Sequence, residues 1–241
     1  MGAPVRHFPT TQWSIVFCAQ GVKTPDAREA LERLFTTYWY PVYAFIRSRT
    51  SQAADAEDLT QGFFTSLLGL RSLDTVRPEY GRFRAFLLAS AKHYLAAERA
   101  RDRTQKRGGD TVVLPLDFAS ADTRYRLEAP DDSNPELAFE RQWARATFGA
   151  ALEKMRKEFA EAGKAVHFEA FRQYLTAGAQ PLSYSDVASA LEMTEAAVKV
   201  AVHRARRRFG YLLREQIAET VAAGRREVHD EVHYLFRVLT A

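Results

Sequence analysis

Cationic side chains that could bind DNA phosphates recur along one face of a helix predicted from about residue 195 to residue 213. They follow helical spacing and so project from one side: Lys199, His203, Arg204, Arg207 and Arg208. Guanidinium and ammonium groups in such an array bind phosphate oxygens and the edges of bases in the major groove. The residues predicted to contact duplex DNA are Thr194, Glu195, Lys199, His203, Arg204 and Arg207.

Two short helices joined by a tight turn must position these side chains. Ser183 caps the first helix with Asp186 three residues on, and Thr194 caps the second after the turn at 192–193. The second helix carries an apolar stripe at three- to four-residue spacing: Val198, Val202, Ala205, Phe209 and Leu212 or Leu213. Charge pattern alone leaves open an ordinary amphipathic helix pair with a solvated basic face.

The order of residues in this stretch resembles region 4 of the sigma-70 family of bacterial RNA polymerase sigma factors. The resemblance rests on Tyr184-Ser185-Asp186-Val187-Ala188, Leu191 to Thr194, Ala197-Val198-Lys199 and His203-Arg204-Ala205-Arg206. It implies a helix-turn-helix that reads the minus-35 promoter element. This chain has Glu192 where the family usually has Gly. A residue other than glycine in a left-handed turn costs roughly 1 kcal/mol. It also has Val200 and Ala201 where the family often has Ser and Arg.

A second basic stretch, residues 80–107, is aromatic early and strongly cationic late. Aromatic rings stack on unpaired bases while cations follow the backbone, so the pattern suits melted DNA; the alternative is a helix with a solvated basic end. The resemblance places here the family's element for recognising and opening the minus-10 sequence, with Lys92-His93 at its usual Arg-Asn pair. The predicted DNA contacts are Arg84, Lys92, His93, Tyr94, Arg99, Arg101 and Arg103.

Three carboxylates lie in the first turn of the helix predicted over residues 55–68. Their position suits the helix dipole without any further role. The stretch also resembles sigma region 2, in which this helix binds the clamp helices of the polymerase's largest subunit. The resemblance assigns that contact to Asp55, Glu57, Asp58 and Gln61.

Thr60 and Gly62 stand out on the same helix. Related sigma factors commonly carry an acid at the position of Gly62, so the negative face is weaker here. Phosphate on Thr60 would add about 1.5 to 2 negative charges and could bind arginines of a partner, which makes Thr60 a candidate phosphosite for a Ser/Thr kinase. The alternative is a β-branched residue that caps or packs within its own helix.

Helical periodicity predicts an all-α fold. The family resemblance implies two helical domains joined by an extended linker. The aromatic residues between 35 and 45 fall on or beside a leucine stripe, which favours core over base stacking. The predicted division is a region 2-like domain at 1–107, a linker at 108–134, a region 4-like domain at 135–213 and a helical C-terminal extension at 214–241. For the extension, packing on a core is favoured over a regulatory surface.

The composition indicates a chain that builds helical cores, with 241 residues, 46% hydrophobic content and a net charge of +4. The sequence lacks catalytic motifs, so we expect no enzyme and no cofactor. The single Cys18 forms no internal disulfide, and His229 with His233 has no clear third ligand, so we expect no metal site. Neither a signal peptide nor a membrane span is expected, which predicts a cytoplasmic location.

These observations together predict a promoter-specificity subunit that resembles the extracytoplasmic-function class of sigma factors. Its expected partners are core RNA polymerase and promoter DNA, with an inhibitory partner or a Ser/Thr kinase as candidate regulators. Two other classes share some features: an autonomous helix-turn-helix regulator, which needs only residues 181–213, and an interaction protein whose basic helices bind acidic partners.

Overall fold

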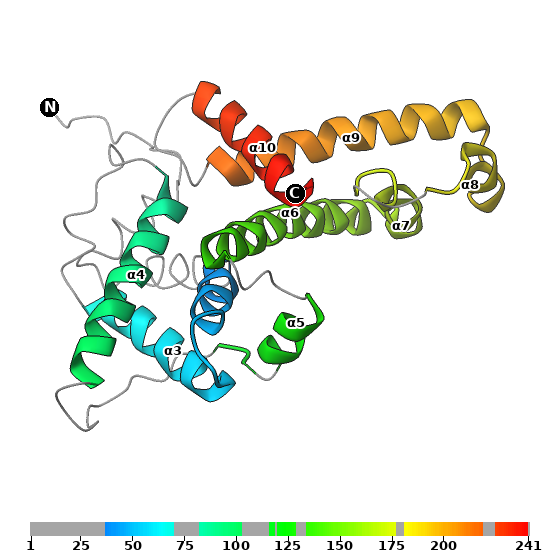
Figure 1. Cartoon of the computed structure of the whole chain (residues 1–241). Helices are drawn as coiled ribbons and strands as arrows, with labels where there is room; N and C mark the ends of the chain where they lie inside the picture. Colours follow the sequence, from blue (N-terminus) through cyan, green and yellow to red (C-terminus); the bar gives the residue numbers. More distant parts are fainter. Residues whose placement is uncertain are drawn as a thin grey trace, which may run out of the picture.

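The structure, a computed structural model, describes residues 37–69, 82–102, 116–118, 120–128, 134–176, 181–218 and 225–240. Every regular element in these ranges is an α-helix, which confirms the predicted all-α class. After a helical segment at 37–47 the elements are α3 (Ala53–Gly69), α4 (Phe83–Asp102), α5 (Ala121–Leu127), α6 (Pro135–Glu161), α7 (Ala165–Arg172), α8 (Tyr184–Ala190), α9 (Glu195–Ala218) and α10 (Arg225–Thr240) (Figure 1).

An aromatic core holds residues 37–47, α3 and α4 together. Tyr38, Phe64 and Phe83 are fully buried, and the rings of Tyr38 and Phe83 meet edge to face at 5.2 Å. Such pairs add to the free energy gained from burying their area. The prediction that the early aromatic residues form a core is confirmed for those described, while Phe35 lies outside the described residues.

The sequence predicts an extended linker at 108–134, but part of this segment is a helix. Among its described residues, α5 is helical, and its Tyr125 is buried. Arg47 Nε donates to Asp122 Oδ1 at 2.9 Å, and Tyr40 donates its hydroxyl to Glu128 at 3.1 Å. These hydrogen bonds dock α5 on the helix at 37–47. The sequence did not predict this because the partners of α5 lie far away along the chain.

The 27 residues of α6 form the central helix of the fold. Asn134 caps it, accepting from the Leu137 amide at 3.1 Å, and Pro135 occupies its first turn. Figure 1 shows α9 beside α6, with α7 and α8 at the end away from α3 and α4. The helix-turn-helix is thus carried on a long helical arm.

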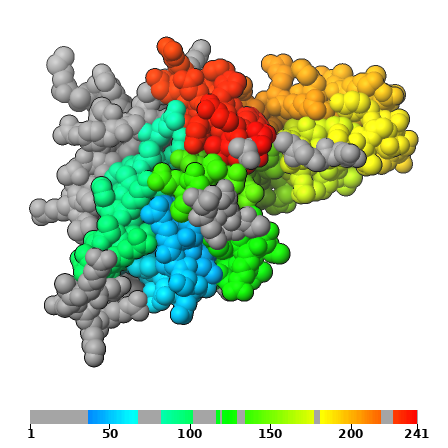
Figure 2. Space-filling model, in the orientation of Figure 1, coloured from blue at the N-terminus to red at the C-terminus, as the bar shows by residue number. Residues whose placement is uncertain are grey.

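The C-terminal helix α10 packs on both α6 and α9. Leu235 is fully buried and Val238 is 5% exposed, and the Phe236 ring lies 6.4 Å from Phe148 of α6. The expectation that the extension covers a core face is confirmed. Figure 2 shows α10 (red) lying over the place where α4 (teal) meets α6 (green). None of the described helices combines the length and apolar character that crossing a membrane requires.

Candidate nucleic-acid interface

A helix-turn-helix is formed by α8 and α9. The Ser183 hydroxyl accepts from the Asp186 amide at 3.1 Å, and the Thr194 hydroxyl accepts from the Ala197 amide at 3.2 Å, so both predicted caps are confirmed. Glu192 has φ 53°, the left-handed conformation expected of the turn. The turn residue therefore adopts the conformation that glycine takes without cost.

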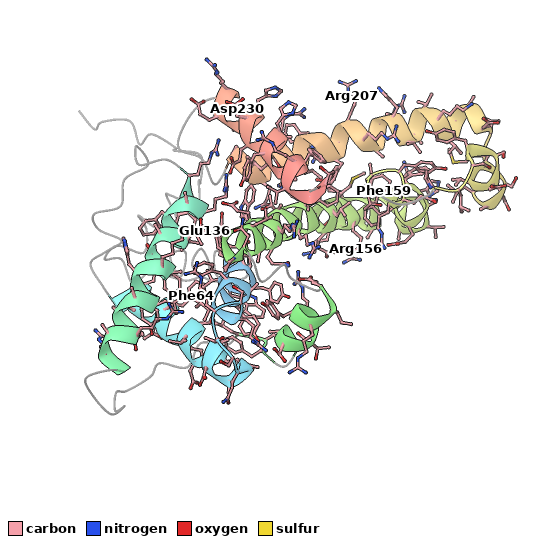
Figure 3. All side chains as sticks on the ribbon, viewed as in Figure 1. Phe64, Glu136, Arg156, Phe159, Arg207 and Asp230 are labelled. Atoms are coloured by element: carbon pink, nitrogen blue, oxygen red, sulfur yellow. The ribbon has the colours of Figure 1, made fainter. Side chains whose placement is uncertain are left out.

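The two faces of α9 differ as predicted. The buried face comprises Val198, Val202, Ala205, Phe209, Leu212, Leu213 and Ile217. His203, Arg204 and Arg207 are exposed, and Figure 3 shows Arg207 pointing away from α6. At 100° per residue, Arg207 and the half-exposed Val200 project almost opposite the buried stripe. An exposed apolar side chain thus lies among the cations of this face.

The cations of α9 differ in how freely they can bind a ligand. Lys199 pairs with Glu195 at 2.6 Å, and two of the three guanidinium nitrogens of Arg208 donate to Glu158, at 2.8 and 2.5 Å. Within the described part of the chain, Arg204 and Arg207 have no such carboxylate partner. A phosphate would not have to displace a carboxylate at these two side chains, so they are best suited to bind one.

The late half of α4 presents an exposed cationic surface. His93, Arg99 and Arg101 are exposed, and Arg101 pairs with Glu98 at 2.7 Å. His93, Tyr94 and Arg101 line a groove of about 340 Å³ between α3 and α4. The Tyr94 ring packs 5.8 Å from that of Phe63, and burial raises the pKa of Tyr94 to about 12. Lys92 pairs with Glu136 of α6, and Arg103 lies outside the described residues.

The DNA contact predicted for Arg84 is not available in this arrangement, because the side chain is buried. Its guanidinium lies over the rings of Trp143 at 4.7 Å and Tyr234 at 4.3 Å, and it pairs with Glu140 and Glu231. Burial opposes its charge, but the hydrogen bond to Glu231 and the two carboxylates outweigh this and raise the pKa of Arg84. Arg84 therefore joins α4 to α6 and α10.

Sequence analysis did not identify Glu231 as a partner of this arginine. Its position carried a signal, since Glu231 falls on the apolar stripe of α10 that contains Val228, Leu235 and Val238. Arg84 falls likewise on the apolar face of α4 with Leu87. A charge within an apolar stripe indicates a buried partner of opposite sign. Sequence spacing does not identify which partner, because 147 positions separate the two residues.

The residues assigned to polymerase binding lie on α3. Asp58 is exposed, while Asp55, Glu57 and Gln61 are half-buried. Asp55 lies in the first turn, where the helix dipole favours a negative charge. All four side chains can thus be reached from solvent, at least in part, by a basic surface of a partner.

Thr60 does not occupy a position suited to a phosphosite in this conformation. Its side chain is fully buried, and its hydroxyl donates to the Ala56 carbonyl oxygen at 2.6 Å. A kinase would need α3 to expose the hydroxyl first. The structure therefore favours the alternative, a β-branched residue bonded within its own helix.

Gly62 of α3 leaves room for the Tyr94 side chain of α4. A Cβ atom at this position would collide with the Tyr94 hydroxyl. A side chain at position 62, such as the acid that related sigma factors carry, would therefore require the Tyr94 ring to move. The sequence interpretation of Gly62 as a weakened negative face did not include this contact.

The histidine pair of α10 is exposed. The Nε2 atoms of His229 and His233 lie 3.1 Å apart. Across the described ranges, no cluster of three or more His, Cys, Asp or Glu side chains could hold a metal ion.

Comparison with protein families adds to this geometry. Residues 34–105 match the family model of sigma-70 region 2, and this range includes all of α3 and α4. No curated protein and no solved structure matches the chain. The match supports a sigma-70 family sigma factor acting in transcription initiation, for which core RNA polymerase and promoter DNA are the implied partners.

Proposed function

We propose that the chain is a sigma factor of the extracytoplasmic-function class, which binds core RNA polymerase in the cytoplasm, directs it to specific promoters and opens the DNA there. The observation that carries the proposal is a capped helix-turn-helix whose Arg204 and Arg207 have no carboxylate partner among the described residues, found on the same chain as a sigma-70 region 2 match. Sigma factors have no enzymatic activity of their own, so the chemistry of RNA synthesis belongs to the polymerase.

In this proposal α9 lies in the major groove of the upstream promoter element. Arg204 and Arg207 bind phosphates or base edges, and His203 lies beside them. Thr194 and Glu195 lie at the N-terminal end of α9, the end that recognition helices direct at base edges. Lys199 contributes once it leaves Glu195.

We assign the downstream, melted element to α4. The groove lined by His93, Tyr94 and Arg101 combines aromatic and cationic side chains, as a surface for unpaired bases requires. Arg99 is exposed on the same helix, and Arg103 is assigned to the same element from the sequence. The acidic and polar residues of α3 form the contact with polymerase in this proposal.

The main alternative is an autonomous helix-turn-helix regulator, since α8 and α9 are complete without α3 and α4. Affinity for core polymerase separates the two. The labelled full chain should bind bacterial core polymerase, and Asp58→Ala should weaken binding while Glu153→Ala, on the exposed side of α6, should not. Failure to bind core polymerase, together with tight binding to duplex DNA in its absence, would favour the regulator.

A further inference from the structure

Acidic side chains from the C-terminal half of the chain form ion pairs with arginines at the start of α4. Glu231 of α10 is fully buried and accepts from Arg84 Nε at 2.6 Å. The other oxygen of the same carboxylate pairs with Arg82 Nε at 2.8 Å. Glu140 of α6 pairs with Arg84 from another side, so two carboxylates enclose one guanidinium.

The same pairing continues along α4, where Lys92 pairs with Glu136 in the first turn of α6. Figure 3 shows Glu136 at the end of α6 that adjoins α4. We call the basic residues Arg82, Arg84 and Lys92 the basic edge of α4. The acidic residues Glu136, Glu140 and Glu231 are the acidic face.

The carboxylates of the acidic face bind cationic side chains in the same way as the phosphates of a nucleic acid. A carboxylate offers a guanidinium two charged acceptor oxygens, as a phosphate does. Arg84 and Lys92 are also among the residues that sequence analysis assigned to melted DNA. The acidic face thus occupies side chains that suit a nucleic acid.

The contact between the two surfaces is polar and costly to bury. Glu140 Oε2 is buried and has no hydrogen-bond partner among the described residues. Burial raises the pKa of Glu140 and nearby Glu231 adds to this, although Arg84 opposes it. A buried ion pair gains little over the cost of desolvating its charges. Another polyanion that pairs with the same cations in water can therefore compete with the acidic face.

Apolar contacts hold α10 on its own half of the chain. Leu235 and Val238 are buried, and Phe236 meets Phe148 of α6. By contrast, α10 meets the start of α4 through the ion pairs of Glu231 with Arg82 and Arg84 and through the Tyr234 ring, over which both guanidinium groups lie. Among the described residues, α6 and α10 therefore form a unit that carries all three carboxylates, and the contact where this unit can separate from α4 is built on the charged groups of Arg82, Arg84 and Lys92.

We propose that the acidic face is a built-in competitor for nucleic acid: it covers the basic edge of α4 in the free protein, and single-stranded DNA displaces it. This inference rests on the proposed role of α4 in binding melted DNA. The free protein is then held in a form with low affinity for melted DNA.

Salt-dependent binding of the full-length chain to a short fluorescein-labelled single-stranded DNA of mixed sequence tests the proposal. Glu231→Gln releases Arg82, while Arg84 keeps its pairing with Glu140, so the plot of log K against log salt should become steeper by about 0.7, which corresponds to one more phosphate. Binding should tighten roughly tenfold if the open form rises from about a tenth to nearly all molecules.

Asp230→Asn is the matched control. It removes the same charge from the neighbouring position of α10, but Asp230 is exposed and points outward, so the slope should stay at the wild-type value (Figure 3). Glu136→Gln is a second test that does not disturb a buried group, because the Glu136 side chain is 51% exposed; it should steepen the slope by about 0.7. Circular dichroism establishes that each variant is folded.

Wild-type slopes in folded Glu231→Gln and Glu136→Gln would overturn the proposal, as would weaker DNA binding by either variant. The proposed function fails separately. If the chain starts promoter-dependent transcription but the slopes do not change, only the competitor is refuted. If the slopes steepen but the chain neither binds core polymerase nor supports initiation, the sigma function is refuted and the competitor stands.

Discussion

The free arginines of α9 should account for measurable phosphate contacts with duplex DNA. We expect that Arg204→Ala and Arg207→Ala each weaken binding across DNA sequences, because each side chain is exposed and has no carboxylate partner among the described residues. Arg208→Ala is the matched control. It makes the same substitution on the same helix, but Glu158 already holds the Arg208 guanidinium at two nitrogens.

The magnitude follows from counterion release. Each phosphate contact on duplex DNA contributes about 0.9 to the slope of log K against log salt. The double variant Arg204→Ala/Arg207→Ala should therefore have a slope smaller by about 1.8. A fourfold rise in salt, from about 50 mM to about 200 mM, lowers the affinity about 3.5-fold for each phosphate contact. The wild type makes two contacts that the double variant lacks, so it should lose about 12-fold more affinity over this range.

Fluorescence anisotropy with a labelled duplex measures these slopes directly. Arg208→Ala should change the slope by clearly less than either Arg204→Ala or Arg207→Ala. Equal changes for all three would mean that only total charge matters. A double variant with the wild-type slope would refute the placement of α9 on DNA.

Three further predictions concern stability, measured by urea unfolding. Glu192→Gly should stabilise the protein by about 0.5 to 1 kcal/mol, because φ 53° is unfavourable for a side chain; a loss of stability would contradict this. Gly62→Ala should destabilise it by about 1 kcal/mol through the clash with Tyr94, yet become neutral or stabilising in a Tyr94→Phe background, and equal effects in both backgrounds would exclude the clash. The hydrogen bond from Arg47 lowers the pKa of Asp122, so Asp122 stabilises the fold above its ordinary pKa of 3.8 and loses this as pH falls further. Asp122→Asn should accordingly cost about 1.5 kcal/mol at neutral pH and progressively less below about pH 4; a constant difference would contradict the assignment.

Local patterns were sufficient to predict most helices and the helix-turn-helix. The caps at Ser183 and Thr194 depend on hydroxyls and amides a few residues apart, so spacing alone reveals them. The buried stripe of α9 follows from the 3.6-residue period for the same reason.

Contacts between distant segments were not predictable in this way. The docking of α5 depends on Arg47 and Asp122, which are 75 positions apart, and the burial of Arg84 depends on Glu231. Thr60 shows the same limit, because helical spacing does not reveal how deeply α3 is covered. A charged residue within the apolar face of a helix indicates that it has a buried partner of opposite charge, but only the tertiary structure shows which residue that partner is.

Reconstituted transcription measures the proposed sigma activity itself. Bacterial core polymerase would be incubated with fragments of the source genome, with and without the chain, and the 5′ ends of the transcripts mapped. The account predicts discrete 5′ ends that appear only with the chain, share upstream and downstream sequence elements, and are lost with Arg204→Ala/Arg207→Ala. Identical transcripts with and without the chain, from a protein that binds duplex DNA alone, would contradict it.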